Sequence, residues 1–413
     1  AIGVATNGNE LFDITDKAFY TYNPLTAEIE AYSKVQGMAD MGMQCVGYDM
    51  ATGTTVLAYS NGNIDLFKNN TFYRIPDLKI KTIAGEKSIN AIYVEGGFAY
   101  LSTSIGVVVI DIKKQNVKET YEFNRDNSIL SIRGFWPQGD SLYTITNFGM
   151  YSADRNSKTL QNFQIWKTLD TVKTYKHIAG YGNELFVATD KSVYSINNGL
   201  KTLVYTSATG IEHLDPADGH LLISEYDTAN FTGSIHFYST AKGIYDSVLT
   251  PGSRPRQTVE MLNGRLCIAD EFGGLLQELD NRQLGYFTPI GPMNSNSFDL
   301  YANDGELWVS HGGFDEKYNV AFNNKGISKY KDGVWKYYAP GIYPPFNGIT
   351  DFSVLLKDEK NGTVYAGSFI NGLYIMKADG TGKLYNAPNP FDRSVAYGPT
   401  DAQIAGLGLD SYG

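Results

Sequence analysis

The feature that most constrains this sequence is a pattern of short apolar segments separated by tight turns, which recurs along the chain. One copy contains an alternating segment at 89–93, apolar segments at 98–103 and 107–111, and another alternating segment at 117–123. Segments of this kind, rich in β-branched and aromatic residues and divided by glycine-containing turns, are typical of antiparallel β-strands. Because an isolated four-stranded sheet leaves both faces and both edges open, the pattern predicts packing against neighbouring sheets of the same kind.

Nine copies of this pattern can be aligned on their second and third segments. The copies follow one another at about 43 residues, the spacing of four-stranded propeller blades, and none shows the 3.6-residue period of a helix. The sequence therefore predicts an all-β fold, a β-propeller of four-stranded antiparallel blades. The aligned pairs are 11–15 with 18–22, 56–59 with 62–67, 98–103 with 107–111, 142–146 with 149–153, 185–189 with 192–196, 221–224 with 233–237, 266–269 with 274–276, 307–310 with 326–330, and 364–367 with 372–376; a tenth copy begins at 404–410.

The number of copies bears on the domain organisation, because one ring usually holds four to eight blades. Residues 283–296 are rich in glycine and proline, which indicates a boundary. The copies after it differ in style, with Trp308 at the end of 304–308 and Trp335 at the end of 331–335. We therefore expect a seven-bladed propeller at residues 1–286 and additional blades of a second, incomplete propeller at 287–413. One ring of eight or more blades over 1–413 remains the alternative.

Composition and motifs exclude several function classes. The net charge of −10 argues against a nucleic-acid binder, and the absence of a run of eighteen apolar residues argues against a membrane-spanning helix. Neither a nucleophile elbow nor a phosphate-binding loop is present. His177, His213 and Glu212 fall in expected innermost strands, where we expect them to line the channel rather than hold a metal. Cys45 and Cys267 belong to distant repeats and are expected to be buried free thiols. We predict no catalytic residue, no metal and no cofactor.

Candidate binding residues lie mainly in the loops between second and third strands, which gather around one mouth of a propeller channel. Asn–Phe and Glu–Tyr pairs in these loops offer hydrogen bonds beside flat apolar faces, which suits a sugar ring or an extended peptide. Such residues also serve tight turns and blade packing, so a structural role remains the alternative. The predicted ligand-binding residues are Asn61, Asn147, Phe148, Glu225, Tyr226, Arg254, Arg256, Phe272, His311, Phe369 and Asn371, with the two arginines as the candidates for an anionic ligand.

The longest departure from the repeat is an insertion at 311–325, which we call the insertion. Long loops on a rigid scaffold often carry function. With Phe314, Tyr318 and Phe322, it is expected either to contact a partner or to cover the channel mouth.

Several segments resemble the PorZ-type proteins of the type IX secretion system of Bacteroidota, which are themselves similar to propeller sensor domains of hybrid two-component systems. The resemblance implies two seven-bladed propellers and a β-sandwich, in a non-catalytic protein of the outer-membrane surface. It also implies binding of anionic lipopolysaccharide and work beside a sortase-like transpeptidase and β-barrel proteins. No binding motif of the family can be transferred residue by residue. The segments that carry the resemblance are 30–40, 59–67, 75–77, 99–111, 291–297, 307–313 and 367–374.

We therefore expect a non-catalytic scaffold and binding protein of the type IX secretion attachment complex, exported to the cell surface, outer membrane or periplasm. Its expected partners are secretion-complex proteins including a sortase-like transpeptidase, with anionic lipopolysaccharide or peptide as further ligands. The chain starts at Ala1 without methionine, so we expect any export signal to have been removed or to lie outside this sequence. Alternatives are a periplasmic ligand-sensing propeller of a hybrid two-component system, and a propeller enzyme such as a calcium-dependent lactonase or lyase.

Overall fold

The computed structural model divides the chain into two compact units, Ala1–Thr288 and Pro289–Gly413. Within its described residues, the strands form nine four-stranded antiparallel sheets and one two-stranded sheet. These sheets confirm the predicted all-β class and the four-stranded antiparallel blades. The structure describes residues 1–24, 26, 28–82, 86–125, 128–172, 174–197, 199–279, 282–287, 291–294, 296–388, 390–391 and 401–410.

Seven of the four-stranded sheets belong to the first unit, and in each of them consecutive strands are neighbours. The blades are β1 (Gly3–Thr6) to β4 (Glu28–Tyr32) with β2 (Leu11–Ile14) and β3 (Phe19–Asn23); β5 (Met43–Asp49), β6 (Thr54–Tyr59), β7 (Ile64–Lys68) and β8 (Thr71–Ile75); β9 (Ile89–Glu95), β10 (Phe98–Thr103), β11 (Gly106–Asp111) and β12 (Asn116–Tyr121); β15 (Ile132–Gln138), β16 (Ser141–Thr146), β17 (Gly149–Asp154) and β18 (Lys167–Asp170); β19 (His177–Tyr181), β20 (Glu184–Ala188), β21 (Ser192–Asn197) and β22 (Leu200–Thr206); β23 (Ile211–Ala217), β24 (His220–Asp227), β25 (Thr232–Ser239) and β26 (Gly243–Pro251); and β27 (Pro255–Glu260), β28 (Leu266–Asp270), β29 (Gly274–Glu278) and β30 (Leu284–Phe287).

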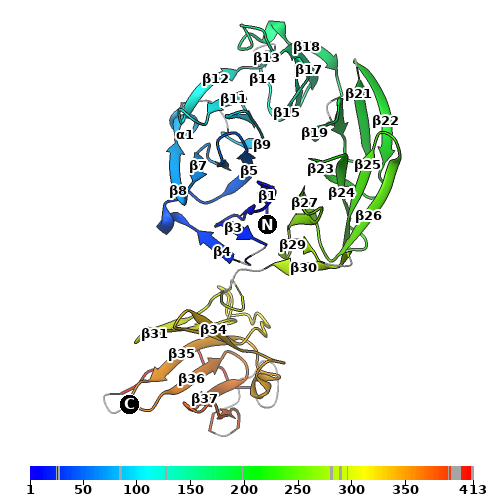
Figure 1. Cartoon of the computed structure of the whole chain (residues 1–413). Helices are drawn as coiled ribbons and strands as arrows, with labels where there is room; N and C mark the ends of the chain where they lie inside the picture. Colours follow the sequence, from blue (N-terminus) through cyan, green and yellow to red (C-terminus); the bar gives the residue numbers. More distant parts are fainter. Residues whose placement is uncertain are drawn as a thin grey trace. The chain divides into compact units, whose positions relative to one another are not determined.

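The first strands of these blades form a closed ring. Contacts run from β1 to β5, β9, β15, β19, β23 and β27 in turn, and β27 contacts β1 again. Figure 1 shows the blades of the first unit around this common centre. A small sheet of β13 (Asn124–Arg125) and β14 (Ser128–Ile129) and the short helices η1 (Lys34–Gln36) and α1 (Asp77–Ile80) lie in the connections between sheets. The short helix η2 (Phe163–Ile165) lies between β17 and β18 of one blade.

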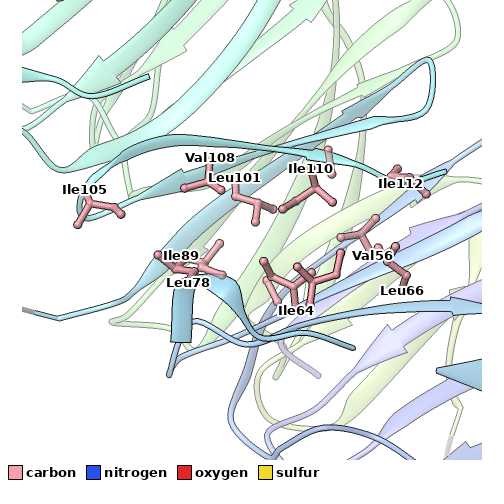
Figure 2. Close-up of a cluster of buried hydrophobic side chains, with 13 residues drawn as sticks. Val56, Ile64, Leu66, Leu78, Ile89, Leu101, Ile105, Val108, Ile110 and Ile112 are labelled. Carbon is pink, nitrogen blue, oxygen red and sulfur yellow. The ribbon is translucent and has the colours of Figure 1, made fainter. Parts of the chain in front are cut away.

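The core of the first unit lies between adjacent blades. In Figure 2, Val56 and Leu66 of one blade face Leu101 and Ile110 of the next, and all four side chains are buried. Because a middle strand such as β11 is covered by a blade on each side, every one of its residues is buried. Complete burial of each such aliphatic side chain contributes about 1.5–3 kcal/mol to folding.

Glycine is required where the second and third strands meet at a tight turn. Gly106 has φ 133°, and a Cβ at this position would lie 2.2 Å from the carbonyl oxygen of Tyr121. Only a residue without a side chain allows β11 to approach β12 this closely.

The second unit, described by itself, contains two four-stranded sheets and η4 (Pro344–Phe346). The backbone amide of Ala402 donates to Ile370 O at 2.9 Å, and that of Ile404 donates to Ser368 O at 3.0 Å. The start of the expected tenth copy therefore runs along the second sheet of this unit. The sheets are β31 (Leu300–Asn303), β32 (Glu306–Ser310), β33 (Ile327–Lys331) and β34 (Val334–Tyr338), and β35 (Phe352–Asp358), β36 (Thr363–Ser368), β37 (Gly372–Met376) and β38 (Gly382–Tyr385).

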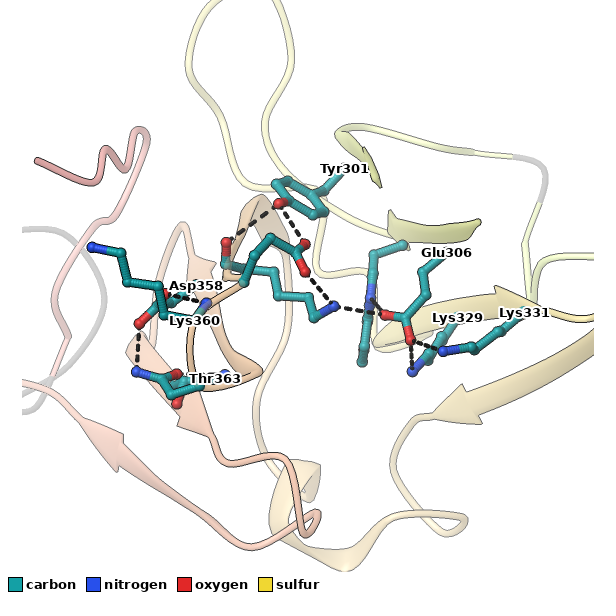
Figure 3. A network of polar contacts seen from close by, with 11 residues as sticks. Tyr301, Glu306, Lys329, Lys331, Asp358, Lys360 and Thr363 are labelled. Atoms are coloured by element: carbon teal, nitrogen blue, oxygen red, sulfur yellow. Dashed lines mark hydrogen bonds and ion pairs between the residues drawn. The ribbon is translucent and has the colours of Figure 1, made fainter. Parts of the chain in front are cut away.

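A buried carboxylate joins these two sheets. Glu306 on β32 contacts the ammonium groups of Lys329 and Lys331 on β33, each at 2.9 Å, and that of Lys357 on β35 at 3.1 Å (Figure 3). Trp308 Nε1 donates to the same carboxylate at 3.3 Å. Burial opposes the charge of Glu306, but these donors outweigh it and hold the pKa of the carboxyl well below its usual range.

Cys45 and Cys267 are both free thiols; Cys267 is buried and Cys45 is half-buried. Burial raises the pKa of each thiol to about 12, which keeps both in the unreactive protonated form. Over the described residues, no helix combines the length and the apolar character needed to cross a bilayer.

Candidate functional site

The centre of the first ring is a cavity of about 800 Å³, lined mainly by the first strands of its seven blades. Its charged lining differs from the chain as a whole. Although the chain has a net charge of −10, the lining has a charge of +2 when its histidines are neutral. The charged lining residues are Arg133, Lys176, Lys191, Arg254 and Arg256, against Asp190, Glu212 and Asp215.

A β-bulge recurs near the start of the first strand in five blades of this ring, at the same end as the loops between second and third strands. In β5, β9, β15, β23 and β27 the pairing with the second strand skips one residue. A bulge turns a side chain out of the regular alternation, and all five skipped residues line the cavity. We call these five residues the bulge ring: Gln44, Asn90, Arg133, Glu212 and Arg256.

Members of the bulge ring reach from one blade to the next. Asn90 Nδ2 donates to Ile132 O at 2.6 Å, and Arg133 Nη1 donates to Tyr175 O at 3.0 Å. Glu212 accepts from Arg254 Nη2 at 3.1 Å. These contacts link adjacent blades at the mouth of the cavity and hold polar groups there.

Gln44, Asn90 and Arg133 are not among the residues predicted from the sequence to bind a ligand. Most of those predicted residues lie in loops between second and third strands, whereas the bulges lie in first strands. The available signal was a polar residue repeated at the same place in successive copies, since Asn90, Arg133 and Lys176 lie 43 residues apart.

Arg254 and Arg256 form the most highly charged part of the mouth, which we call the arginine pair. Arg254 contacts Glu212 at 3.1 Å and Glu271 at 3.3 Å. Arg256 contacts the same two carboxylates at 3.6 and 3.3 Å. The backbone amide of Arg254 donates to Asp270 Oδ1 at 2.6 Å, so the loop that carries Glu271 is fixed beside the arginine pair.

Aromatic rings lie next to the arginine pair. The Arg254 guanidinium carbon is 5.3 Å from the ring centroid of Tyr226, a cation–π distance. The ring of Phe272 is 6.0 Å from that of Tyr226 in an edge-to-face arrangement. Phe272 is 57% exposed whereas Tyr226 is buried, so the structure brings four predicted residues together and leaves one aromatic face open to solvent.

Two histidines and a carboxylate lie deeper along the same wall. The rings of His177 and His213 are 4.7 Å apart, and His213 Nδ1 lies 3.0 Å from Asp215 Oδ1. Burial opposes charge on His213, but Asp215 outweighs it and raises the pKa of the imidazole. Burial and the neighbouring His213 lower the pKa of His177 well below its usual value. The described residues contain no group of three or more His, Cys, Asp or Glu side chains arranged to hold a metal ion.

The other predicted residues of the first unit make internal contacts. Asn61 Nδ2 donates to Asp40 Oδ2 at 2.8 Å, and Phe148 packs in an aromatic cluster between blades. Asn147 is half-buried in the turn between β16 and β17. Glu225 is buried on β24, where it accepts from Thr209 Oγ1 at 3.1 Å. Ligand binding by these residues stays a prediction.

The predicted residues of the second unit face its interior. His311 is fully buried between Ser328 Oγ, at 2.8 Å, and a backbone carbonyl, and burial lowers the pKa of its imidazole. Phe369 is buried against Phe314 with ring centroids 4.3 Å apart. Asn371 Oδ1 accepts from the Thr350 amide at 2.9 Å. Their contacts are those of structural residues, and their predicted binding role is untested.

The insertion presents its aromatic side chains differently. Tyr318 and Phe322 are 67% and 64% exposed, and both have positive φ, 62° and 52°. Such backbone is costly for a bulky residue. Buried Asp351 holds the segment, because its carboxylate accepts from the amides of Phe322 and Asn323, each at 2.8 Å. The insertion thus holds two aromatic side chains, Tyr318 and Phe322, exposed to solvent.

Comparison with known proteins supports the resemblance found in the sequence. Residues 11–167 match the family described as "TSS9, PorZ, N-terminal beta-propeller domain", which confirms the similarity to PorZ-type proteins over that segment. No curated protein matches the sequence.

Solved structures show the same fold. PorZ of Porphyromonas gingivalis, described as an essential bacterial surface component of the type IX secretion system, matches with a TM-score of 0.73 at 17% identity. The match covers 100% of this chain and 55% of that one, so this chain spans about half the length of that PorZ chain. A chain of the mitotic checkpoint complex (TM-score 0.51, 16% identity, 66% of this chain and 88% of that one) and the WD40 propeller of Doa1 (0.53, 9%, 68% and 93%) share the propeller architecture.

Proposed function

We propose that this PorZ-like propeller protein is a non-catalytic binding and assembly component of a type IX secretion system at the bacterial cell surface. The observation that carries the proposal is the family match over residues 11–167. The fold likeness to PorZ over 100% of the chain supports it. The proposed partners are proteins of the secretion complex, including a sortase-like transpeptidase.

The geometry of the mouth supports recognition rather than chemistry. Its carboxylates are held by basic partners: Glu212 and Glu271 by the arginine pair, and Asp215 by His213. Each of these carboxylates therefore already has a basic partner within the site. The exposed Phe272 ring beside these charges offers the mixed polar and apolar contacts of a binding surface.

Binding of anionic lipopolysaccharide is the more demanding part of the proposal. The arginine pair is already compensated by two carboxylates. An anionic glycan at this place would have to displace at least one carboxylate, whereas a protein partner can also use the exposed aromatic side chains.

The test is to delete the gene in its source bacterium and to measure the attachment of secreted cargo to the cell surface. We expect attachment to fail in the deletion strain and to return when the wild-type gene is restored. In the restored strain, cross-linking of the tagged protein in intact cells should recover the transpeptidase and other secretion components. Normal cargo attachment in the deletion strain, together with cross-links that contain no secretion component, would refute the proposed function.

A further inference from the structure

We propose that the mouth of the first ring binds a carboxylate-bearing peptide, and that Glu271 occupies the carboxylate position when no ligand is bound. The proposal rests on the proposed role as a binding protein, but it does not depend on which secretion partner supplies the peptide. The arginine pair would bind the carboxylate of the peptide, and Glu271 of the chain itself would compete with that carboxylate.

The charge of the cavity lining favours an anionic ligand. The cavity lining has a charge of +2 within a chain of net charge −10. A cleft whose lining carries an excess of one sign of charge concentrates ligands of the opposite sign. All five basic residues of this lining lie at the mouth. Arg133, Lys176, Arg254 and Arg256 are at or next to the starts of first strands, and Lys191 is in the loop between β20 and β21. An anionic group is therefore favoured at this place even though the protein as a whole repels anions.

The two carboxylates beside the arginine pair, Glu212 and Glu271, differ in exposure and in their contacts. The Glu212 side chain is 17% exposed, and it contacts Arg254 through one oxygen and Arg256 through the other. The Glu271 side chain is 41% exposed, and its contacts to both arginines, each 3.3 Å, use the same oxygen, Oε2. Glu212 is thus an integral part of the wall, while Glu271 lies over the arginine pair from the solvent side. Ion pairs with this exposure are weak, so an external carboxylate can replace Glu271.

An exposed aromatic ring lies next to the position of the Glu271 carboxylate. Glu271 is followed in the chain by Phe272, whose exposed ring lies beside Tyr226 and therefore beside the arginine pair. The mouth thus already holds an acidic residue followed by an aromatic one. Guanidinium groups pair with carboxylates in a planar geometry, and an adjacent ring adds an apolar surface. An acidic peptide with an apolar residue next to its carboxylate reproduces the Glu271–Phe272 pair that already lies at this place, and a glycan does not.

The test is direct binding of a short peptide to the full chain, measured by fluorescence anisotropy. The probe is a fluorescein-labelled peptide with the sequence of residues 269–274, Ala-Asp-Glu-Phe-Gly-Gly. We expect Glu271→Gln to bind this probe about fivefold more tightly than the wild type, because the competing ion pair is removed. Adding Arg256→Met to that variant should abolish the gain. Glu316→Gln, at an exposed carboxylate of the insertion, is the matched control and should bind as the wild type does.

Three outcomes would overturn the proposal. They are equal affinity of the wild type and Glu271→Gln, binding that Arg256→Met does not weaken, and equal binding of a C-terminally amidated probe in which Asn and Gln replace Asp and Glu. Polygalacturonate, an anionic glycan, is tested in parallel; if it gains affinity in Glu271→Gln while the peptide does not, the peptide assignment is wrong. Because these are measurements on the purified protein, they can fail while the gene deletion still stops cargo attachment, and the reverse also holds.

Discussion

Glu306→Gln isolates the electrostatic contribution of the buried carboxylate that joins β32, β33 and β35. The substitution keeps the size of the side chain and leaves an oxygen to accept from Trp308. It removes the charge that compensates Lys329, Lys331 and Lys357. Lys357 would keep its contact with Glu359 at 2.8 Å. Lys329 and Lys331 would lose their carboxylate beside it, so we expect the second unit to lose stability.

The magnitude follows from the exposure of the groups. Breaking a fully buried ion pair costs about 3–5 kcal/mol, whereas exposed pairs contribute about 0–1 kcal/mol. The Glu306 side chain is 8% exposed, but Lys329 and Lys331 are 22% and 49% exposed and can regain water. We therefore expect a loss of about 2 kcal/mol in the free energy of unfolding of the second unit, between these limits.

The pH dependence separates charge from packing. The folded-state pKa of Glu306 is depressed, so its contribution is present above the unfolded-state pKa of about 4.3 and is lost as pH falls toward the folded-state value. The stability difference between wild type and Glu306→Gln should be constant from about pH 6 to 8 and should shrink below about pH 4.

The assay is urea unfolding monitored by hydrogen exchange. Exchange of peptides from the second unit reports the stability of that unit separately from the first. Glu316→Gln serves as the control and should leave exchange unchanged. A difference below about 0.5 kcal/mol at neutral pH, or a larger difference that persists undiminished at pH 3, would refute the reasoning.

Three further predictions concern other parts of the chain. Gly106→Ala should lower the urea midpoint of the first unit by the equivalent of about 2 kcal/mol or more, because its Cβ would clash with the carbonyl of Tyr121; an unchanged midpoint would contradict this. Cys45 and Cys267 should resist iodoacetamide at pH 8 in the folded protein and react in denaturant, as measured by mass spectrometry, since burial raises both thiol pKa values to about 12; fast labelling of the folded protein would count against it. Asp351→Asn should speed hydrogen exchange in the insertion and leave the first unit unaffected, because the insertion loses its charged acceptor; unchanged exchange would show that other contacts hold it.

The blades could be predicted from the sequence because the information for them is local. Alternation of apolar residues and the glycines of the turns are visible within one copy, as at 98–111, and each copy forms a sheet of consecutive neighbours. That topology also places the loops between second and third strands next to one another, around one mouth of the channel. This is why Tyr226 and Phe272 could be selected before their contacts were known. Arg254 and Arg256 were selected on their charge, as the candidates for an anionic ligand.

The remaining parts of the site depend on pairing between segments. A bulge is a property of the register between two strands, so the skipping of Asn90 or Arg133 cannot be seen in either strand alone. The same holds for His311, which follows an apolar strand and looks accessible in the sequence. Its burial depends on Ser328 from the other side of the insertion and on a backbone carbonyl at Asn296.

The repeated bulge has a consequence for substitutions at the cavity of the first ring. Each bulge residue is released from strand pairing, while the residues around it keep their register and remain in the core. Substitution at Gln44 or Glu212 therefore changes a side chain that lines the cavity, while the strand pairing of its blade stays the same. Five blades of one ring can therefore change the polar groups at the cavity independently of one another, while the hydrophobic contacts between blades stay the same.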